Sequence, residues 1–299
     1  MKRSHRQFRK IHLYGAIALF LAISIVARPI EAFQRDDLKR MRDTGTCPAC
    51  NLVDAKLSGR DFREGDLSAA NAMGANLTST LLTGANLFRT NLSGAKLDKS
   101  QLERANLGDA NLSEASARSA LFSDAVLDGA QLEKANLREA DLQGVSAIAA
   151  SFKTADLREA NLTQAKLKNA DLSGANFQDA ILDRTDLQGT KIDEKTILEP
   201  RWLTVRELAN GRRDDLAGTD LQDIYLEDLD LNAIELSEVN LANAYLFNIN
   251  LQGATLDRAS LQQATLLYAD LEGASLQAAN LAEADLRQAR AQTTNLVGA

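Results

Sequence analysis

Residues 135–139 read Ala-Asn-Leu-Arg-Glu, and residues 155–159 read Ala-Asp-Leu-Arg-Glu. This five-residue unit governs most of the chain. Between residues 52 and 192, 26 of the 29 positions at every fifth residue are Leu, Phe or Ile, and between residues 216 and 296, 16 of 17 are Leu. Two places before these positions, Ala occupies 20 of 29 sites in the first block and 9 of 17 in the second. The chain is therefore an internal repeat with a period of five.

A period of five fits neither regular secondary structure. A helix presents the same face every 3.6 residues and a strand every second residue. A chain that turns a corner every five residues satisfies the pattern, because the large apolar residue and the small residue then point inward each time. Stacked coils of this kind pair their backbone groups along the stack, at roughly 4.8 Å per coil.

The unit resembles the A(D/N)LXX repeat of the pentapeptide-repeat family over residues 50–192 and 214–298. The resemblance implies an all-β fold, a right-handed quadrilateral β-helix with four pentapeptides, or twenty residues, per coil. Short helices would cap or interrupt it. A twenty-residue step predicts a ladder of amide side chains along one corner. Its members would be Asn51, Asn71, Asn91, Asn111 and Gln131.

An interruption divides the repeat into two blocks, and spacing does not decide whether they form one column or two. Pro200 opens a short amphipathic pattern that Asn210-Gly211 would end, so we expect a helix there. We expect Trp202 to cover exposed core; the alternative is an aromatic recognition element. The predicted segments are a signal peptide (1–32), a cap with the cysteines (33–49), the first block (50–192), a helical insertion (193–213) and the second block (214–299).

The first 32 residues have the features of a secretory signal peptide. Residues 1–10 carry five Lys/Arg and no acid, residues 11–27 are apolar, and cleavage is expected between Ala32 and Phe33. The alternative is a membrane anchor formed by residues 11–27, near the short limit for a span. Cleavage would remove both histidines and leave 28 Lys+Arg against 40 Asp+Glu, a formal charge of −12. In a cyanobacterium, the exported protein would lie in the periplasm or the thylakoid lumen.

The segment between the predicted leader and the first repeat holds both cysteines. Residues 34–42 have helical spacing of apolar residues and are expected to cap the first coil. Cys47 and Cys50 are too few ligands for zinc, and a redox-active pair normally opens a helix in a βαβ unit. We favour a structural disulfide, which suits an oxidising compartment and would pin the cap to the first coil. A CxxC pair directly before the first repeat also resembles cyanobacterial members of the family.

The second block carries an unusual group of aromatic residues. Tyr225 and Tyr245 are twenty residues apart, which would stack them on one outward face, and Phe247 and Tyr268 lie near them in sequence. One interpretation is local variation beside the interruption. The other is a protein-contact surface, because Tyr is favoured at binding hot spots.

The sequence contains no Gly-rich phosphate loop, nucleophile elbow or other catalytic signature. An exported form without His also excludes His-based catalysis and His-ligated metals. We therefore expect no enzyme, no cofactor and no metal site. The acidic balance argues against nucleic acid as a partner.

Two classes of function remain. The first is an exported structural or protein-interaction scaffold with an unidentified protein partner, or the same scaffold anchored in a membrane. The second is a DNA mimic that binds a type II topoisomerase, as some family members do. A charge of −12 permits mimicry, but the leader places the protein elsewhere, and Lys96, Arg138, Arg158 and Lys166 interrupt the acidic surface. A homodimer through the C-terminal coil is a further hypothesis, because a second copy can cover an open end.

Overall fold

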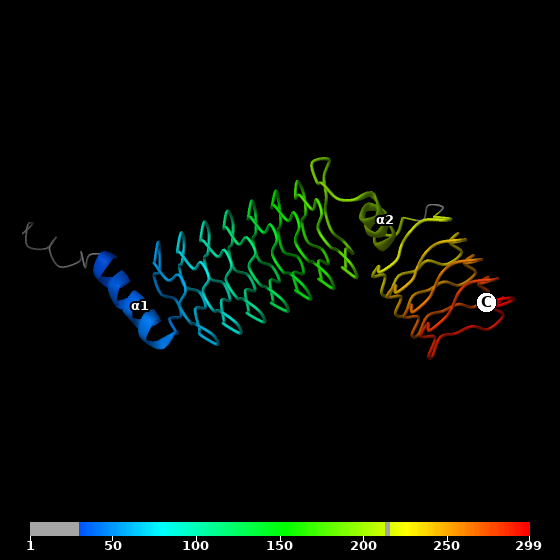
Figure 1. Ribbon diagram of the computed structural model, residues 1–299, viewed down its shortest axis with the longest axis horizontal. Helices are drawn as coiled ribbons and strands as arrows, with labels where there is room; N and C mark the ends of the chain where they lie inside the picture. The colour runs from blue at the N-terminus through cyan, green and yellow to red at the C-terminus, as the bar shows by residue number, and fades with distance from the viewer. Residues whose placement is uncertain (1–29, 213–215) are drawn as a thin grey trace, which may run out of the picture.

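The computed structural model describes residues 30–212 and 216–299 (Figure 1). Within these residues it has two helices, α1 (Ile30–Thr44) and α2 (Pro200–Ala209), and two stacks of coils. We call the stack formed by residues 47–197 the first column and the stack formed by residues 216–299 the second column. Residues 1–29 of the predicted signal peptide lie outside the described residues.

Successive coils pair in parallel with a step of twenty residues. The bridges run from Asn51–Asn71 to Asp171–Lys191 in the first column, and from Asp220–Asn240 to Ser275–Asn295 in the second. Each side of a coil contributes a single bridge residue between two turns, so the described residues contain no continuous strand. The period implied by the resemblance is present, although each side is too short to form a regular strand.

The corners are tight turns with one residue in the left-handed region. At a representative corner, the N–H of Ala55 donates to the carbonyl of Leu52 (3.0 Å), and Asp54 between them has φ +54°. A turn of this kind needs a positive φ at its third residue. Non-glycine residues fill most of these corners, at φ between +52° and +62°. Since that region is unfavourable for L-residues, pairing between coils must hold the corners in place.

The core is a narrow column of stacked apolar side chains. Leu87, Leu107 and Leu127 succeed one another at twenty-residue steps and are fully buried. Burying each such side chain contributes about 1.5–3 kcal/mol. The Ala two places before each Leu is buried as well, and its small side chain lets the corner close over the core.

The predicted amide ladder forms only in part. Asn91 Nδ2 donates to Asn71 Oδ1 at 3.0 Å. The Oδ1 atoms of Asn51, Asn71, Asn91 and Asn111 also accept the backbone N–H two residues further on. Each Asn therefore stabilises its own turn, and the Oδ1 atom of Asn71 accepts both this local bond and the ladder bond from Asn91.

Helix α1 lies at the start of the first column and is longer than the predicted 34–42 helix at both ends. It runs across the predicted cleavage point between Ala32 and Phe33. Met41 is fully buried, and the carboxylate of Asp37 accepts the N–H of Asn51 in the first coil (2.9 Å). These contacts attach the helix to the exposed end of the column.

The first column ends after a register change. Its last bridge joins Asn176 to Ile197, a step of 21 residues, so the coil pattern continues past residue 192, where we expected the block to end. The second column then abuts the last coil. The N–H of Arg184 donates to the carbonyl of Asp223 (2.6 Å), a bond that a further coil of the first column would otherwise provide. The blocks therefore form two abutting columns, and Figure 1 shows their axes at different inclinations.

Helix α2 fills the space between the columns on one side (Figure 1). It starts at Pro200, and Gly211 beyond its end has φ +87°, as the Pro and Gly signals predict. Trp202 is 1% exposed and packs with Val205 and Leu208 in the core. Its polar groups also serve the last coil: Arg206 donates to the carbonyl of Thr190 at 2.8 and 3.2 Å. Backbone groups that would otherwise be buried without partners are thus satisfied.

A membrane span needs a long apolar helix, and neither α1 nor α2, the helices of the described residues, meets that requirement.

The left-handed corners give a direct stability prediction at Ala149, which is exposed and has φ +56°. Ala149→Val should lower the free energy of unfolding by about 1–2 kcal/mol, because a β-branched side chain tolerates positive φ poorly. Ala149→Gly should leave it unchanged or slightly raised, since Gly adopts this region without strain. Urea midpoints compare the two variants. Equal midpoints for Val and Gly would show that the corner is not held at positive φ.

Candidate functional site

The four aromatic residues singled out from the sequence lie together. The rings of Tyr225 and Tyr245 are stacked, with centroids 5.1 Å apart and planes at 8°. Phe247 continues the stack 6.1 Å from Tyr245, and Tyr268 meets Phe247 edge-on at 5.4 Å. We call these four residues the aromatic strip. Contacts of both geometries are favourable for aromatic pairs.

The coil geometry explains this arrangement. Tyr225 and Tyr245 are bridge partners in successive coils, so their side chains leave the same face one above the other. Phe247 follows in the adjoining turn, and Tyr268 occupies the left-handed corner one coil further on, at φ +62°. A bulky residue is uncommon at positive φ. Tyr268 remains 45% exposed, so the strip reaches solvent.

A cleft of about 380 Å³ opens beside the strip, where the second column meets the first. We call it the junction cleft. Its lining residues are Asp124, Gly144, Gln164, Ala165, Lys166, Arg184 and Asp186 from the first column and Tyr225 and Tyr245 from the second. The cleft exists because the columns abut without continuing one stack. Arg184 braces it by donating to the carbonyl of Asn243 at 3.2 Å.

The first coil of the second column is strongly acidic. Residues 216–235 include six Asp/Glu and no Lys or Arg. Glu227 in this coil accepts a hydrogen bond from the Tyr225 hydroxyl. Burial, followed by repulsion from Asp228 and Asp186, raises the pKa of Glu227 above its ordinary value. Repulsion by these two carboxylates exceeds the opposing attraction of Lys166 and Lys168.

Three other groups near the junction also have a raised pKa. Burial raises the pKa of Asp186. Burial, then repulsion from Asp223 across the junction, raises the pKa of Asp183. At the strip itself, burial and then the charges of Glu227 and Asp228 raise the pKa of the Tyr245 hydroxyl. Glu227 and Asp228 therefore place negative charge near Tyr245, a member of the aromatic strip.

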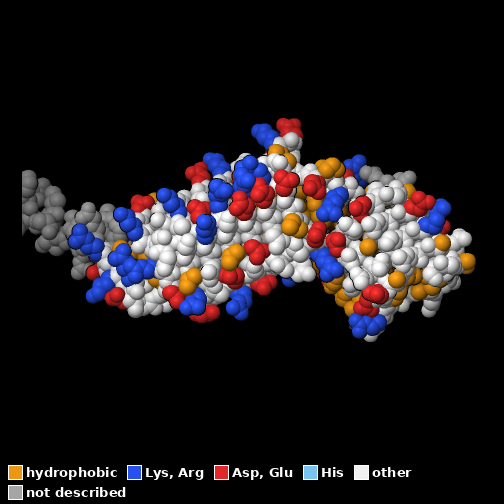
Figure 2. Space-filling model, in the orientation of Figure 1, with side chains coloured by type: hydrophobic (Ala, Val, Ile, Leu, Met, Phe, Trp, Pro, Cys, Tyr) orange, Lys and Arg blue, Asp and Glu red, His pale blue; other side chains and the backbone are white. Residues whose placement is uncertain are grey.

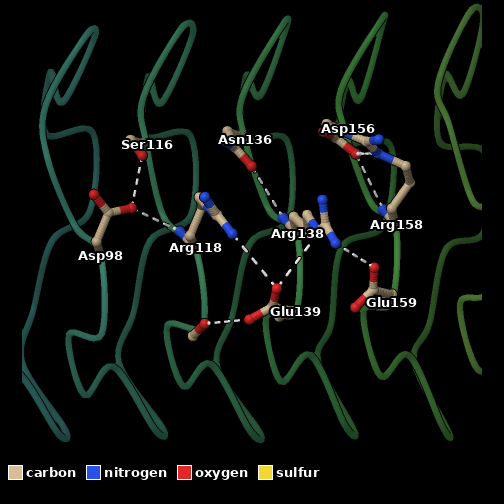
Figure 3. Close-up of polar contacts among 10 residues, drawn as sticks. Asp98, Ser116, Arg118, Asn136, Arg138, Glu139, Asp156, Arg158 and Glu159 are labelled. Atoms are coloured by element: carbon tan, nitrogen blue, oxygen red, sulfur yellow. Dashed lines mark hydrogen bonds and ion pairs between the residues drawn. The ribbon is translucent and has the colours of Figure 1, made fainter.

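The first column has a different surface, with ion pairs between successive coils. Arg138 pairs with Glu159 at 2.6 Å and Arg118 with Glu139 at 3.5 Å, while Arg158 pairs with Asp156 within its own coil (Figure 3). Figure 2 shows basic and acidic side chains interspersed over this column. Exposed pairs of this kind add little stability. They do prevent a continuous anionic stripe on the face that the figures show.

The cysteine pair lies beneath α1, at the start of the first column. Cys47 and Cys50 are joined in the structure, with Cα atoms 5.5 Å apart, and both are buried. Arg40 of α1 donates to both sulfur atoms. With Asp37, the two cysteines are the one group of three potential metal ligands in the described residues. Disulfide-bonded sulfurs are not metal ligands, and zinc takes four donors, so the group does not fit a zinc site.

Comparison with known proteins identifies the family. The family model for pentapeptide repeats matches in eight copies, well over half of the chain. The matches cover residues 50–87, 85–124, 105–144, 155–192, 234–267, 254–290 and 269–299. The chain therefore belongs to the pentapeptide-repeat family, as the A(D/N)LXX units predict.

Several solved structures are similar to this chain. HetL, a pentapeptide-repeat protein involved in heterocyst differentiation regulation in Nostoc sp. strain PCC 7120, is 25% identical; the match covers 88% of this chain and 96% of HetL, with a TM-score of 0.33. Rfr23 of Cyanothece 51142 is 25% identical over 55% of this chain and 99% of its own, with a TM-score of 0.29. A pentapeptide-repeat protein of the Arabidopsis thaliana thylakoid lumen is 26% identical over 39% and 74%, with a TM-score of 0.20. Among curated proteins, none matches this sequence.

Sequence reasoning located the aromatic strip but missed the cleft beside it. Arg184 and Asp186 are distant in sequence from Tyr225 and Tyr245, and only the abutting columns bring them together. One available signal was overlooked: the six acidic residues of 216–235, next to the interruption, mark an unusual coil.

The charge balance at the strip predicts the effect of neutralising Glu227. Because the folded state raises the pKa of Glu227, folding favours its protonated form. The associated stability is present below the unfolded pKa and is lost as the pH rises through the folded value. Glu227→Gln should therefore raise the free energy of unfolding by about 0.5 kcal/mol at pH 7, and the gain should shrink near pH 4.

The matched control is Glu238→Gln, which removes the same charge from an ion pair with Arg258 (3.0 Å). Glu238→Gln should not raise the free energy of unfolding at either pH 7 or pH 4. The measurement is the urea midpoint of each variant and of the unsubstituted protein at both pH values. A gain at Glu227 that does not depend on pH would contradict the electrostatic account.

Proposed function

We propose that this protein is an exported, non-enzymatic scaffold that binds a protein partner through the aromatic strip. The observation that carries the proposal is the contact of four aromatic rings on the surface of an otherwise aromatic-poor repeat. Tyr is enriched at the energetically dominant positions of protein interfaces. Rings that are already packed on one another also lose little conformational entropy on binding.

A column of repeats suits a scaffold. We infer that both columns wind as the right-handed quadrilateral β-helix that the family resemblance implies; the twenty-residue pairing and four turns per coil support this. Such a column holds side chains at a regular spacing on a stiff surface. The proposed role needs no cofactor, which agrees with the lack of a catalytic motif in the sequence.

The proposed location is outside the cytoplasm, in the periplasm or the thylakoid lumen. It is supported by the basic start and apolar stretch of residues 1–32 and by the paired Cys47 and Cys50, which suit an oxidising compartment. Cleavage between Ala32 and Phe33 would release the scaffold. Retention of residues 11–27 would instead anchor it to a membrane.

A second copy of the chain is a further proposed partner, through the coil of residues 280–299. Leu296 and Val297 there are 47% and 68% exposed, and Leu281 and Leu286 are only partly covered. Sedimentation should show a dimer that Leu286→Glu disrupts, because a buried unpaired charge is costly at an apolar contact. A monomer at all concentrations would remove this proposal.

Site-specific photocrosslinking tests the scaffold role. A benzophenone amino acid in place of Tyr268 should give a discrete adduct in native cells, and Tyr245→Ala should abolish it, because the neighbouring ring is part of the same surface. The same probe in place of Phe88, which is 36% exposed on the first column, is the matched control. Adduct formation no greater at position 268 than at position 88 would refute the proposal.

Intact mass and N-terminal sequencing of native protein test the export proposal. We expect a chain that begins at Phe33, has the mass of the oxidised cysteine pair and is found in a soluble exported fraction. A cytosolic chain with an intact N-terminus and free thiols would contradict it.

A further inference from the structure

We propose that the junction cleft is an arginine-binding site: it receives the guanidinium group of a cationic segment of the partner, packed against the stacked Tyr225–Tyr245 pair and paired with Asp186 in the lining and with Glu227 beside Tyr225. This inference rests on the proposed function, because it specifies the chemistry by which the aromatic surface recognises its partner.

The geometry of the cleft suits a flat cation. Tyr225 and Tyr245 line it from the second column and present stacked rings, while the carboxylate of Asp186 lines it from the first. Glu227 is held at the side of Tyr225 by the hydroxyl hydrogen bond. A guanidinium group is planar, stacks on aromatic faces and pairs with carboxylates through several donors at once. The volume of the junction cleft, about 380 Å³, lies within the range of small-ligand pockets.

The lining of the cleft is balanced in charge, and the excess of negative charge that favours a cation comes from the adjoining coil of residues 216–235. The lining has two acidic residues, Asp124 and Asp186, and two basic residues, Lys166 and Arg184; the Arg184 side chain donates to the carbonyl of Asn243. Lys166 and Lys168 do not offset the repulsion that Asp228 and Asp186 exert on Glu227. Burial, followed by the charges of Glu227 and Asp228, raises the pKa of the Tyr245 hydroxyl, so these two carboxylates also act on the stacked rings. A positive group placed between rings and carboxylates would relieve this repulsion.

The chain itself twice uses the arrangement that we propose. Beside the same junction, the guanidinium of Arg201 lies 4.3 Å from the ring centroid of Trp202 and 3.3 Å from a carboxylate oxygen of Asp183. On the first column, Arg89 lies over the ring of Phe88 at 4.8 Å and pairs with Asp109. In both cases an aromatic face and a carboxylate hold one arginine. The junction cleft offers the same two elements, and the arginine in its lining, Arg184, donates to the carbonyl of Asn243.

The test uses the whole protein, labelled with 3-fluorotyrosine, and the probe peptide acetyl-Gly-Arg-Gly-amide. Fluorine NMR should show a saturable shift of the Tyr225 and Tyr245 signals, assigned with Tyr→Phe variants, and a smaller change at Tyr268. A peptide with citrulline in place of Arg has the same shape without the charge and should not bind. A peptide with Lys in place of Arg should bind several-fold more weakly, because an ammonium group is not planar and cannot pair with a carboxylate through two parallel hydrogen bonds.

Two variants distinguish binding at this site from a general effect of the protein's negative charge. Glu227→Gln should weaken binding of the Arg peptide about two- to fivefold, the scale of one exposed charge interaction, while it leaves the protein folded. Glu238→Gln removes an equal charge from another part of the second column and should leave the affinity unchanged. Equal binding of the citrulline peptide, or equal effects of the two variants, would overturn the inference.

The outcomes also distinguish this inference from the proposed function. A specific crosslink at position 268 with no saturable binding of the Arg peptide overturns the arginine site and leaves the scaffold role intact. Saturable binding of the peptide at Tyr225 and Tyr245 without a crosslink supports the arginine site and overturns the partner assignment.

Discussion

Backbone hydrogen bonds between successive twenty-residue coils are the interaction on which the rest of this structure depends. Each corner places a residue at positive φ, which is costly for the many non-glycine residues found there. Leu57, for example, donates to the carbonyl of Asn76, and the N–H of Asn76 donates back to the carbonyl of Ala55. These bonds fix the register, and the register in turn stacks the leucines, the alanines and the outward-facing side chains. A stack of this kind gains stability mainly from contacts between neighbouring coils.

The same constraint explains the junction. Pairing at twenty residues cannot continue when the chain gains a residue before Ile197, and the open coil must be covered. Helix α2 supplies Trp202 for the core and Arg206 for a free carbonyl, and the second column provides one backbone bond to Arg184. Because the columns abut at an inclination, a cleft remains beside the first acidic coil. The proposed site is thus a consequence of interrupting a regular stack.

Much of the fold could be predicted because it is local and periodic. The leucine period predicts the coils, Pro200 and Asn210-Gly211 predict α2, and the twenty-residue spacing predicts that Tyr225 stacks on Tyr245. The amide ladder is present only in part: Asn91 donates to Asn71, while the Oδ1 atoms of Asn51, Asn71, Asn91 and Asn111 all accept an N–H of their own turns. The cleft could not be predicted, since Arg184 meets Asn243 across 59 residues and the interruption. The period of the sequence contains no information about how the two columns pack against each other.

The twenty-residue register of the coils can be tested by measuring a single distance. Ser58 and Gln178 are exposed on one face and six coils apart. Spin labels at Ser58→Cys and Gln178→Cys, with the native cysteine pair kept oxidised, should give a narrow distance distribution centred at about 29 Å, six steps of 4.8 Å. A broad distribution, or one centred far from this value, would contradict a stack of twenty-residue coils and with it the placement of the aromatic strip and the junction cleft.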